Sequence, residues 1–363
     1  MEFIELAELC DKGSSNLAQK DLVFDSGIYP VYGAPGEITK VDFFHQGKPY
    51  LGLIKDGAGV GRVMQLPANS SVIGTIQYIF PKENIDLKYL YYLIKYLDLG
   101  KANTGATIPH IYFKDYKKRK VKVREYSEQK HIGQILELID SHLRTYKKVL
   151  EQYDLLIKSR FVDMFGDPVL NEKGWNLTSL ESVCQSIYGG GTPSKKIKEY
   201  YMGTIPWVTS KDMKSDIIVD SIEHITQEAI DNSSTKIIPP ESVLIVIRSG
   251  ILKHTLPVCI NKSKVTINQD LKALVLDERC KGIYLQYLLK ALEKDILSGV
   301  RAVTADNIEF NSLKKREIPI PPIDIQIKFS QMVNQINKLK SDVQKSIDET
   351  QLLMDSLMQE YFG

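Results

Sequence analysis

Three adjacent glycines beside a cluster of lysines are the residues of this chain best suited to bind a polyanion. The segment reads GGGTPSKKIKEYY over residues 189–201 and contains Lys195, Lys196 and Lys198. Glycines let backbone N–H groups approach a phosphate closely, and the lysines supply positive charge. A tight turn followed by a solvated run of charges would have the same composition. The segment therefore predicts either a phosphate-binding loop or an ordinary surface turn.

Further polar side chains in the second half have the chemistry to reach the edges of nucleic-acid bases. The candidates are Ser210, Lys211, Arg248, Lys253, His254, Gln269 and Arg301. Arg248 comes directly after the apolar run SVLIVI (residues 242–247), and arginine is the commonest reader of guanine. The amides of Asn268 and Gln269 could read adenine or cap a turn. Trp207 lies just before two of the candidates, and we expect its indole in the core rather than stacked on a base.

Weaker candidates of the same kind occur in the first half. They are Lys40, Lys55, Arg62, Thr104, Thr107 and His110. Each alone is more typical of a solvated surface residue, but together they would form a positive face. TGATIPH at residues 104–110 corresponds by position to SGVRAVTADN at residues 298–307, so a shared loop would approach the same ligand in both halves. The basic run at residues 117–120 recurs at residues 314–316 and would either follow phosphates or face solvent.

No spacing in the chain is typical of a catalytic or metal centre. The sequence has no NPP or DPP tripeptide, no Walker A motif and no HExxH motif. GAGVG at residues 57–61 follows a strand-like run, but the next residues read as a strand and a turn instead of the helix that a dinucleotide site needs. Cys10, Cys184, Cys259 and Cys280 lack CxxC spacing and are expected to be buried thiols. We therefore expect no catalytic residue, no bound metal and no cofactor.

Length and composition are those of a soluble protein with more than one domain. The 363 residues suit two or three domains. No apolar run approaches the ~20 residues that cross a bilayer, so we expect no membrane role. The first 13 residues lack the basic and apolar regions of a secretory signal, so a cytoplasmic location is expected. The 47 basic and 45 acidic residues give a net charge of +2, which neither requires nor excludes nucleic acid.

The chain contains an internal repeat. SRFVDMFG, which ends at Gly166, matches SLMQEYFG, which ends at Gly363, at an offset of 197 residues. Further matches at this offset are KKRKVKV with KKREIPI and Gln129 with Gln326. LAELC, which ends at Cys10, matches LESVC, which ends at Cys184, at an offset of 174 residues. The chain is therefore predicted to be two copies of one unit, the second longer by 23 residues in its globular part.

Each copy is predicted to combine a mixed domain with a long helix. Apolar residues from Ile132 to Ile157 recur in alternating steps of 4 and 3, as in a coiled-coil seam, and a similar stripe runs from Phe329 to Leu357. The rest of each copy alternates short β-like runs with glycine and proline turns and one helix-like stretch. The expected boundaries are mixed domains at residues 1–125 and 167–322 and long helices at residues 126–166 and 323–363.

The repeat also predicts the fold class. If a pseudo-twofold axis relates the two copies, the second helix runs antiparallel to the first. The expected class is α+β, with two mixed α/β domains separated by a two-helix antiparallel coiled coil. The 37 residues from Gln129 to Phe165 would form a rod of roughly 55 Å between the domains.

Several phrases, in their order, resemble a known family. GGGTPSK, IPWVTSKDM, INQDLKAL and IPIPPIDIQ in the second half, with YPVYGAPG and LIKDGAGVG in the first, are similar to phrases of the DNA specificity subunit, HsdS, of Type I restriction-modification systems. The resemblance runs along the whole chain, and SRFVDMFGDP opens the second half. It departs where the first copy reads VKVRE (residues 121–125) and the second reads IPIPP (residues 318–322). Proline would fix the second domain on its helix more rigidly than the first.

This resemblance implies a non-catalytic DNA reader. Each mixed domain would be a target-recognition domain for one half of a bipartite, asymmetric site in double-stranded DNA, which the polar candidates above would contact. The helices would set the gap between the halves and dock two methyltransferase subunits, and restriction subunits would join the complex. The helix residues expected at the docking surface are Ile132, Leu136, Phe161, Phe165, Phe329, Met358 and Phe362.

Two other interpretations stay open. The chain could be the detached recognition portion of a fused methyltransferase-nuclease, although a chain that begins at a domain and ends with the repeat favours a complete unit. It could also be a coiled-coil assembly protein. Binding to duplex DNA that weakens with salt would distinguish the DNA reader from the assembly protein.

Overall fold

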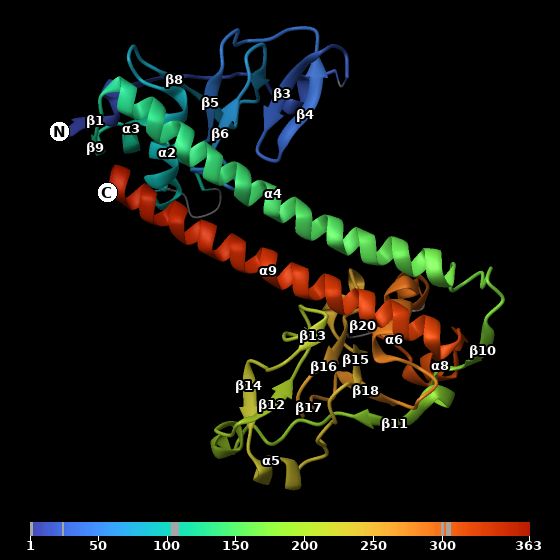
Figure 1. Cartoon of the computed structure of the whole chain (residues 1–363). Helices are drawn as coiled ribbons and strands as arrows, with labels where there is room; N and C mark the ends of the chain where they lie inside the picture. The colour runs from blue at the N-terminus through green and yellow to red at the C-terminus, as the bar shows by residue number, and fades with distance from the viewer. Residues whose placement is uncertain (1–2, 24, 103–108, 299–300, 303–305) are drawn as a thin grey trace. The chain divides into compact units, whose positions relative to one another are not determined.

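The chain folds into two compact units that share two long helices. The computed structural model describes residues 3–23, 25–102, 109–298, 301–302 and 306–363. The first unit consists of Met1–Val149 and Val343–Gly363, and the second of Leu150–Asp342. Each unit therefore contains one mixed domain, about half of the helix α4 (Tyr126–Phe165) and about half of the helix α9 (Ile323–Phe362) (Figure 1).

The mixed domain of the first unit has two small sheets. The four-stranded sheet has the order β2 (Cys10–Gly13), β8 (Ile76–Pro81), β5 (Tyr50–Ile54), β6 (Val63–Leu66), and all its pairs are antiparallel. The three-stranded sheet has the order β4 (Gly36–Val41), β3 (Tyr29–Gly33), β7 (Ser71–Val72). Strand β1 (Phe3–Glu5) pairs with β9 (Lys120–Lys122), and the helices are α1 (Leu6–Leu9), α2 (Leu87–Tyr96) and α3 (Phe113–Tyr116).

Helix α2 connects the first sheet to the long helices (Figure 1). Asp86 caps it, because its carboxylate accepts hydrogen bonds from the N–H groups of Lys88 and Tyr89. Its apolar face packs with the sheet and with the start of α4 and the end of α9 in one core. The members of this core from the four elements include Leu51, Ile79, Leu90, Leu93, Ile132, Leu136, Met358 and Phe362.

The second unit is a larger version of the same arrangement. Its five-stranded sheet has the order β11 (Cys184–Gly189), β18 (Leu271–Leu276), β15 (Val243–Val246), β16 (Val258–Asn261), β13 (Ile217–Ile218). A three-stranded sheet has the order β14 (Glu223–Ile225), β12 (Ile205–Val208), β17 (Thr266–Ile267). Strand β10 (Asn176–Ser179) pairs with β21 (Glu317–Ile320), and β19 (Arg301–Ala302) pairs with β20 (Asp306–Asn307). The helices are α5 (Gln227–Asp231), α6 (Gly282–Ala291), α7 (Glu293–Ser298) and α8 (Phe310–Lys315).

The two long helices run antiparallel, as the contacts inside each unit show. In the second unit, the ring of Phe165 at the end of α4 lies 5.3 Å from the ring of Phe329 near the start of α9. Further along the same pair, Nζ of Lys340 lies 2.6 Å from Oδ1 of Asp154. In the first unit, the start of α4 shares a core with the end of α9. The predicted fold class, mixed domains on an antiparallel helix pair, is confirmed.

Equivalent elements of the two units follow the internal repeat. The pair β1–β9 corresponds to β10–β21, helix α2 to α6, and α4 to α9. The sheet order β2-β8-β5-β6 corresponds to β11-β18-β15-β16, to which the second unit adds β13. Each unit therefore has the same framework, and the units differ in the segments that connect its strands.

No helix within the described ranges is long and apolar enough to cross a membrane.

Candidate nucleic-acid interface

The two units bring candidate residues to one equivalent place. In the first unit, the loop after β5 meets the segment before α3 through a β-bridge between Asp56 and His110. In the second unit, the loop after β15 meets the segment before α8 through a β-bridge between Arg248 and Asn307. His110 and Asn307 are 197 residues apart, the offset of the repeat. Both mixed domains therefore carry polar loop residues at the same point of the fold.

Arg248 is held in place by Asp270. Its Nε and Nη2 atoms both lie 2.7 Å from Oδ1 of Asp270, and its backbone N–H donates to the Asp270 carbonyl at 3.2 Å. The buried side chain of Asn268 donates to Oδ2 of Asp270 at 3.0 Å and accepts from the Asp270 N–H at 3.1 Å. Asn268 thus stabilises the turn, and the half-exposed guanidinium of Arg248 is oriented before any ligand binds.

Gln269 and the glycine-rich loop join this site. The exposed Gln269 accepts a hydrogen bond from the hydroxyl of Thr192, which follows the three glycines. Thr192, Arg248, Gln269 and Asp270 are called the Arg248 cluster below. Lys272, on β18, lies beside it with its Nζ 5.4 Å from the ring centroid of Phe310. Lys272 lies in the phrase INQDLKAL, but it was not among the candidates because it sits among buried residues of a strand.

Three further candidates lie near the Arg248 cluster. Arg301 pairs with Asn307 in the β19–β20 ribbon, and Asn307 bridges to Arg248, so the backbone at Arg301 adjoins the cluster. The side chain of Arg301 lies outside the described residues. Lys253 and His254 are exposed in the same loop as Arg248, at the end of a 3-10 turn (Gly250–Lys253).

Two of the three glycines are required by packing within the chain. A Cβ atom on Gly190 would lie 1.8 Å from the carbonyl oxygen of Asn268, and one on Gly191 would lie 2.5 Å from the N atom of Thr235. The buried indole of Trp207 donates to the Gly191 carbonyl at 3.0 Å, so the prediction that Trp207 is a core residue is confirmed. The glycines therefore let two chain segments approach each other, and this explains them without a phosphate.

The lysines of the same segment surround a hollow of about 510 Å³. Lys195 and Lys198 line it together with Tyr201, Ile222, Glu223 and His224, and Lys196 is exposed in the same segment. Nε2 of His224 lies 2.7 Å from Oδ1 of Asp220. The Ser221 N–H and the imidazole lower the pKa of the Asp220 carboxyl. His224 was not a sequence candidate, because it comes from β14 and reaches the lysines only through the fold.

Ser210 and Lys211 lie in the loop between β12 and β13. Asp212 organises this loop, because its Oδ2 accepts from the N–H of Thr209 at 2.7 Å and its Oδ1 from the N–H of Ile222 at 2.8 Å. Lys211 is exposed and Ser210 is half-buried. The loop is therefore ordered by its own aspartate, with the lysine on its outer side.

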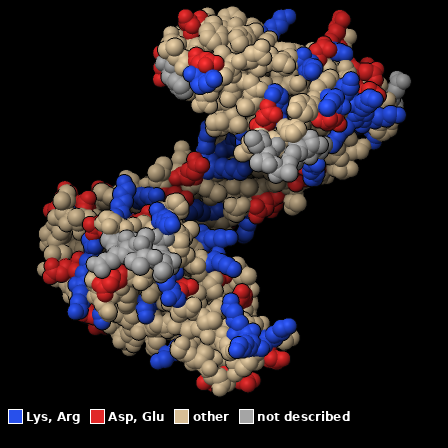
Figure 2. Space-filling model, turned by 180° about the vertical axis from the view of Figure 1, so that it is seen from behind, with Lys and Arg blue, Asp and Glu red and all other residues tan. Residues whose placement is uncertain are grey.

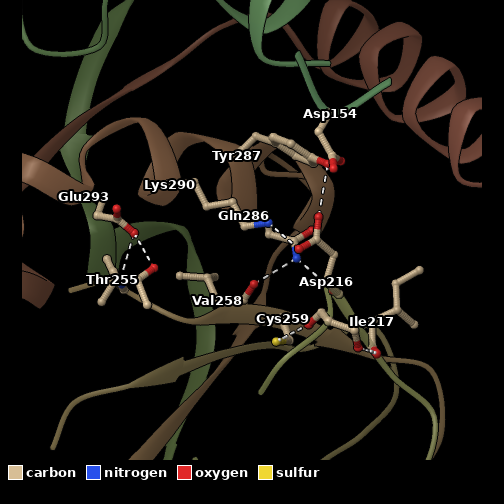
Figure 3. Close-up of polar contacts among 12 residues, drawn as sticks. Asp154, Asp216, Ile217, Thr255, Val258, Cys259, Gln286, Tyr287, Lys290 and Glu293 are labelled. Carbon is tan, nitrogen blue, oxygen red and sulfur yellow. Dashed lines mark hydrogen bonds and ion pairs between the residues drawn. The ribbon is translucent and has the colours of Figure 1, made fainter. Parts of the chain in front are cut away.

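The end of this loop is anchored to helix α6 at Asp216 (Figure 3). The carboxylate of Asp216 lies 2.5 Å from Nζ of Lys290 and 3.2 Å from the hydroxyl of Tyr287. Its carbonyl accepts from Nε2 of Gln286 at 2.7 Å. The thiol of Cys259 donates to the carbonyl of Ser215 at 2.7 Å. A helix that belongs to the core of the second unit thus fixes the position of a candidate DNA-contacting loop.

In the first unit the structure groups three of the candidates. Lys55 forms an ion pair with Asp56, whose backbone bridges to His110. Arg62, at the end of the same loop, donates a hydrogen bond to the carbonyl of Ala34. The ring of His110 lies 5.0 Å from that of Tyr112. This loop occupies the place that the Arg248 cluster occupies in the second unit, with different side chains.

The other candidates of the first unit are not brought to this group. Lys40 lies on β4, opposite Pro30. It is four residues, or roughly 13 Å along the strand, from Gly36, which lies close in sequence to the Ala34 carbonyl that Arg62 contacts. Its Nζ is 4.0 Å from Oε1 of Glu37. Thr104 and Thr107 lie outside the described residues.

The glycines of GAGVG form a turn that packs on the domain. Gly57, Gly59 and Gly61 have φ values of 84°, 86° and 85°, in the left-handed region that favours glycine. A Cβ atom on Gly61 would lie 2.1 Å from the N atom of Gly100. Strand β6 follows, as predicted, so the segment lacks the helix N-terminus on which a dinucleotide would bind.

All seven helix residues expected to dock a partner are buried in the chain's own cores. Ile132, Leu136, Met358 and Phe362 belong to the core of the first unit, and Phe161, Phe165 and Phe329 to that of the second. The rings of Phe161 and Phe165 lie against Phe329 of α9 and also against Tyr284 of α6, and the ring of Phe362 lies against Tyr89 of α2. These side chains therefore join the long helices to each other and to the mixed domains, and their burial leaves little surface for an outside partner.

Exposed leucines on α4 and α9 occur at equivalent positions of the repeat. Leu155 and Leu156 are 64% and 45% exposed, and Leu352 and Leu353 are 69% and 50% exposed. Each member of the second pair lies 197 residues after its counterpart. Because the exposure recurs at equivalent positions of both units, these leucines are candidates for a contact surface.

The cysteines are buried or half-buried thiols, as predicted. Burial raises the pKa of Cys10, Cys184, Cys259 and Cys280 to about 12. A thiol with so high a pKa is not a nucleophile near neutral pH. Across the described part of the chain, no group of three or more His, Cys, Asp or Glu side chains could hold a metal ion.

Positive charge on the surface is divided among several places. On the face drawn in Figure 2, lysine and arginine side chains alternate with aspartate and glutamate, in keeping with the net charge of +2. Positive charge on this face is therefore local and interrupted by acidic residues, so a polyanion would be recognised at particular places and not by one broad basic surface.

The duplicated framework, with polar loops at equivalent points and an antiparallel helix pair, defines a protein with two domains of the same fold. The sequence matches the family described as Type I restriction modification DNA specificity domain over residues 1–152 and 172–350. The chain belongs to this family, and the resemblance noted from its sequence is confirmed.

Relatives within this family are specificity subunits. The chain is 35% identical over 163 residues to the specificity subunit of the Type I restriction enzymes EcoR124I/EcoR124II of Escherichia coli, an alignment covering 44% of this chain and 40% of that protein. It is 28% identical over 217 residues to the MjaIX specificity subunit of Methanocaldococcus jannaschii, covering 57% and 48%. The matched regions thus span less than half the length of these two relatives.

Solved structures share the fold along the whole chain. The S subunit of a Type I restriction-modification system from M. genitalium superposes with a TM-score of 0.69 at 16% identity, covering 100% of this chain and 96% of that one. A chain from a structural study of complex assembly and conformational transition of the type I R-M system gives a TM-score of 0.57 at 15% identity, covering 99% and 97%. These likenesses concern the fold alone.

Proposed function

We propose that this chain is the DNA sequence-specificity subunit of a Type I restriction-modification complex and has no catalytic activity of its own. Each mixed domain reads one half of a bipartite, asymmetric target in double-stranded DNA. The long helices set the distance between the halves and dock two methyltransferase subunits, which restriction subunits join. The observation that carries the proposal is the duplication: two domains of one framework present different side chains at the same point.

The difference between the two sites supports an asymmetric target. The first domain offers Lys55, Arg62 and His110, and the second offers the Arg248 cluster, with its arginine and exposed glutamine. Each set contains an arginine, which favours guanine, but only the second adds a glutamine, which favours adenine, and only the first adds a lysine and a histidine, which contact guanine or phosphates. Two such different sets would read different bases.

The leucine pairs are the surfaces that we assign to the methyltransferase subunits. Leu155 and Leu156 in the second unit and Leu352 and Leu353 in the first are exposed and equivalent. Two equivalent apolar patches on one chain fit two copies of the same partner, because each copy can use the same contacts. This assignment replaces the seven helix residues that are buried in the chain's own cores.

Methylation mapping tests the proposed function. The chain is produced with a Type I methyltransferase subunit from the same genome, in a host whose DNA is then read for methylated adenines. The proposal predicts methylation at one split motif with two unlike halves and an unspecified gap, and its loss when this chain is omitted. Methylation at a continuous motif, or an unchanged pattern without the chain, would refute it.

A further inference from the structure

A buried glutamine lies in the first turn of each long helix. Gln129 is the fourth residue of α4 and Gln326 the fourth residue of α9, and their side chains are 2% and 0% exposed. They are 197 residues apart and therefore equivalent in the repeat. A buried amide needs hydrogen-bond partners, so the identity of those partners shows what the side chain holds.

In the first unit, Gln129 connects α4 to the mixed domain. Its Oε1 accepts from the N–H of Asp86, the residue that caps α2, at 2.9 Å. Its Nε2 donates to the carbonyl of Asn84 at 3.3 Å and to that of Arg124 at 2.9 Å. One side chain thus joins the long helix, the connector before it and the start of α2.

In the second unit, Gln326 makes the same three bonds. Its Oε1 accepts from the N–H of Lys281, which precedes α6, at 2.8 Å. Its Nε2 donates to the carbonyl of Arg279 at 3.0 Å and to that of Pro321 at 2.8 Å. The segment before each long helix differs in sequence, VKVRE at residues 121–125 and IPIPP at residues 318–322. The glutamine nevertheless forms hydrogen bonds to equivalent backbone positions in both units.

A tyrosine of each mixed domain completes the joint. The hydroxyl of Tyr89 donates to the carbonyl of Lys122 at 3.1 Å, and its ring lies 5.2 Å from that of Phe362 at the end of α9. The ring of Tyr284 lies 4.8 Å from that of Phe165 at the end of α4. Its hydroxyl donates to the backbone of the equivalent strand, β21, at 2.7 Å. Each domain is therefore fastened to the start of one long helix and the end of the other.

We propose that Gln129 and Gln326 are positioning residues that fix the angle at which each recognition domain leaves the helix pair, and so restrict the DNA to one gap between the half-sites. This inference rests on the proposed function. Six hydrogen bonds to backbone atoms, three in each unit, define two joints of the same geometry. The segments before the long helices, residues 121–125 and 318–322, can then differ in sequence while the orientation of each domain on the helix pair stays the same.

The test measures how strictly the gap is read. The complex of this chain with its methyltransferase subunits is titrated with duplexes that carry the mapped half-sites at the natural gap and at gaps one or two base pairs shorter or longer. Gln129→Met and Gln326→Met keep the length of the side chain and remove its bonds. We expect the preference for the natural gap over its neighbours to fall about tenfold, because each variant removes the three hydrogen bonds that hold one joint. Binding to a duplex with one half-site stays the same.

Two further variants keep the result interpretable. Gln134→Met, on the exposed side of α4, is the matched control and should leave the gap preference unchanged. If a buried glutamine variant fails to fold, Tyr89→Phe and Tyr284→Phe test the inference instead. Each removes the hydroxyl hydrogen bond of the tyrosine and keeps its ring. These milder variants should weaken the gap preference by several-fold.

The outcomes separate the inference from the proposed function. If the glutamine variants fold and keep the preference for the natural gap, the inference is wrong. The glutamines would then contribute to folding alone. The same conclusion would follow if the glutamine variants unfold and the tyrosine variants keep the preference. If the unaltered complex binds no split duplex at any gap, it is the proposed function that fails.

Discussion

Arg248, which we propose as a base-reading side chain, is already oriented in the chain without DNA. Asp270 holds the guanidinium through Nε and Nη2, and the Arg248 side chain is still 46% exposed. An ion pair this exposed contributes at most about 1 kcal/mol. Exchanging the aspartate for a guanine edge is therefore energetically easy, while the orientation that the aspartate imposes reduces the entropy lost on binding.

Replacing Arg248 should weaken recognition of the second half-site. We expect Arg248→Ala to reduce affinity for the cognate duplex about 10- to 100-fold, since a bidentate arginine contact discriminates by roughly 1–3 kcal/mol. Fluorescence anisotropy at fixed salt measures the loss. Arg279→Ala, which removes another exposed arginine paired with an aspartate in the same unit, is the control and should change affinity little. Equal losses in both variants would mean that Arg248 makes no special contact.

The buried thiols predict a loss of stability in alkali. Cys10, Cys184, Cys259 and Cys280 ordinarily have a pKa of 9.0, and burial raises it to about 12 in the folded chain. The unfolded chain therefore releases these protons first, so their contribution is complete below pH 9 and is lost between pH 9 and pH 12. Urea unfolding followed by circular dichroism should show midpoints that fall from pH 8 to pH 10.5. A constant midpoint over that range would contradict the burial of the thiols.

The position of a single residue in the fold, buried or at the end of a strand, was predictable where its own chemistry or its immediate sequence neighbours determine that position. The buried thiols and the core position of Trp207 follow from composition and size, and Arg248 from its position after an apolar strand. His224 and Lys272 were not predictable, because each reaches its neighbours through strand pairing with distant segments. The expected docking residues are apolar residues of the long helices, and the sequence does not show that they are buried in the chain's own cores.

At the scale of elements, helix α2 uses a tyrosine and a lysine to hold α4. The hydroxyl of Tyr92 lies 3.3 Å from Oε2 of Glu137, and Nζ of Lys95 lies 3.3 Å from Oδ1 of Asp140. Both acids belong to α4. These polar contacts add to the apolar packing between α2 and the long helices in the first unit.

The equivalent side chains of α6 have a different partner. Tyr287 and Lys290 contact Asp216, at the end of the loop that carries Ser210 and Lys211 (Figure 3). The positions equivalent to Glu137 and Asp140 hold Asn334 and Asn337, which have no negative charge. The second unit therefore uses these contacts to anchor a candidate DNA-binding loop.

Releasing this anchor should affect one half-site only. We expect Asp216→Asn to loosen the loop between β12 and β13 and to reduce discrimination against base changes in the second half-site several-fold, because an amide pairs more weakly with Lys290. Competition binding with single-base variants of each half-site measures the effect. Asp140→Asn, which removes the corresponding ion pair of the first unit, should leave second-site discrimination unchanged. A loss in both half-sites from Asp216→Asn would contradict independent domains.

The leucine pairs predict the stoichiometry of the complex. Leu155→Glu with Leu156→Glu should remove one methyltransferase subunit, and Leu352→Glu with Leu353→Glu the other, because a buried carboxylate without a partner is costly. Native mass spectrometry should find one bound copy for each double variant and none when the two are combined. Two copies bound to either double variant would place the docking surface elsewhere.

The elements were predictable to very different degrees. The apolar periodicity predicted both long helices and also α2 and α6, since helical contacts are local in sequence. The order of strands was not predictable. Strand β18, for example, lies between β11 and β15, so it pairs with one strand more than 80 residues earlier. Pairing of this kind depends on which faces the whole domain buries, and short β-like runs do not specify it.

At the scale of the whole molecule, the repeat is the basis of the account. An offset of 197 residues relates the ends of the helices, the buried glutamines, the exposed leucines and the bridges at His110 and Asn307. The matched features lie in the framework, and the loops between equivalent strands differ. A duplicated framework with unlike loops is what a reader of two unlike half-sites needs.

An exchange of one domain tests this central claim most directly. Residues 175–313 are replaced by the corresponding segment of another member of the family, and the methylation motif is mapped in a host that also produces the methyltransferase subunit. The account predicts that one half of the split motif changes to that of the donor, while the other half stays the same. A change in both halves, or a change in neither, would contradict it.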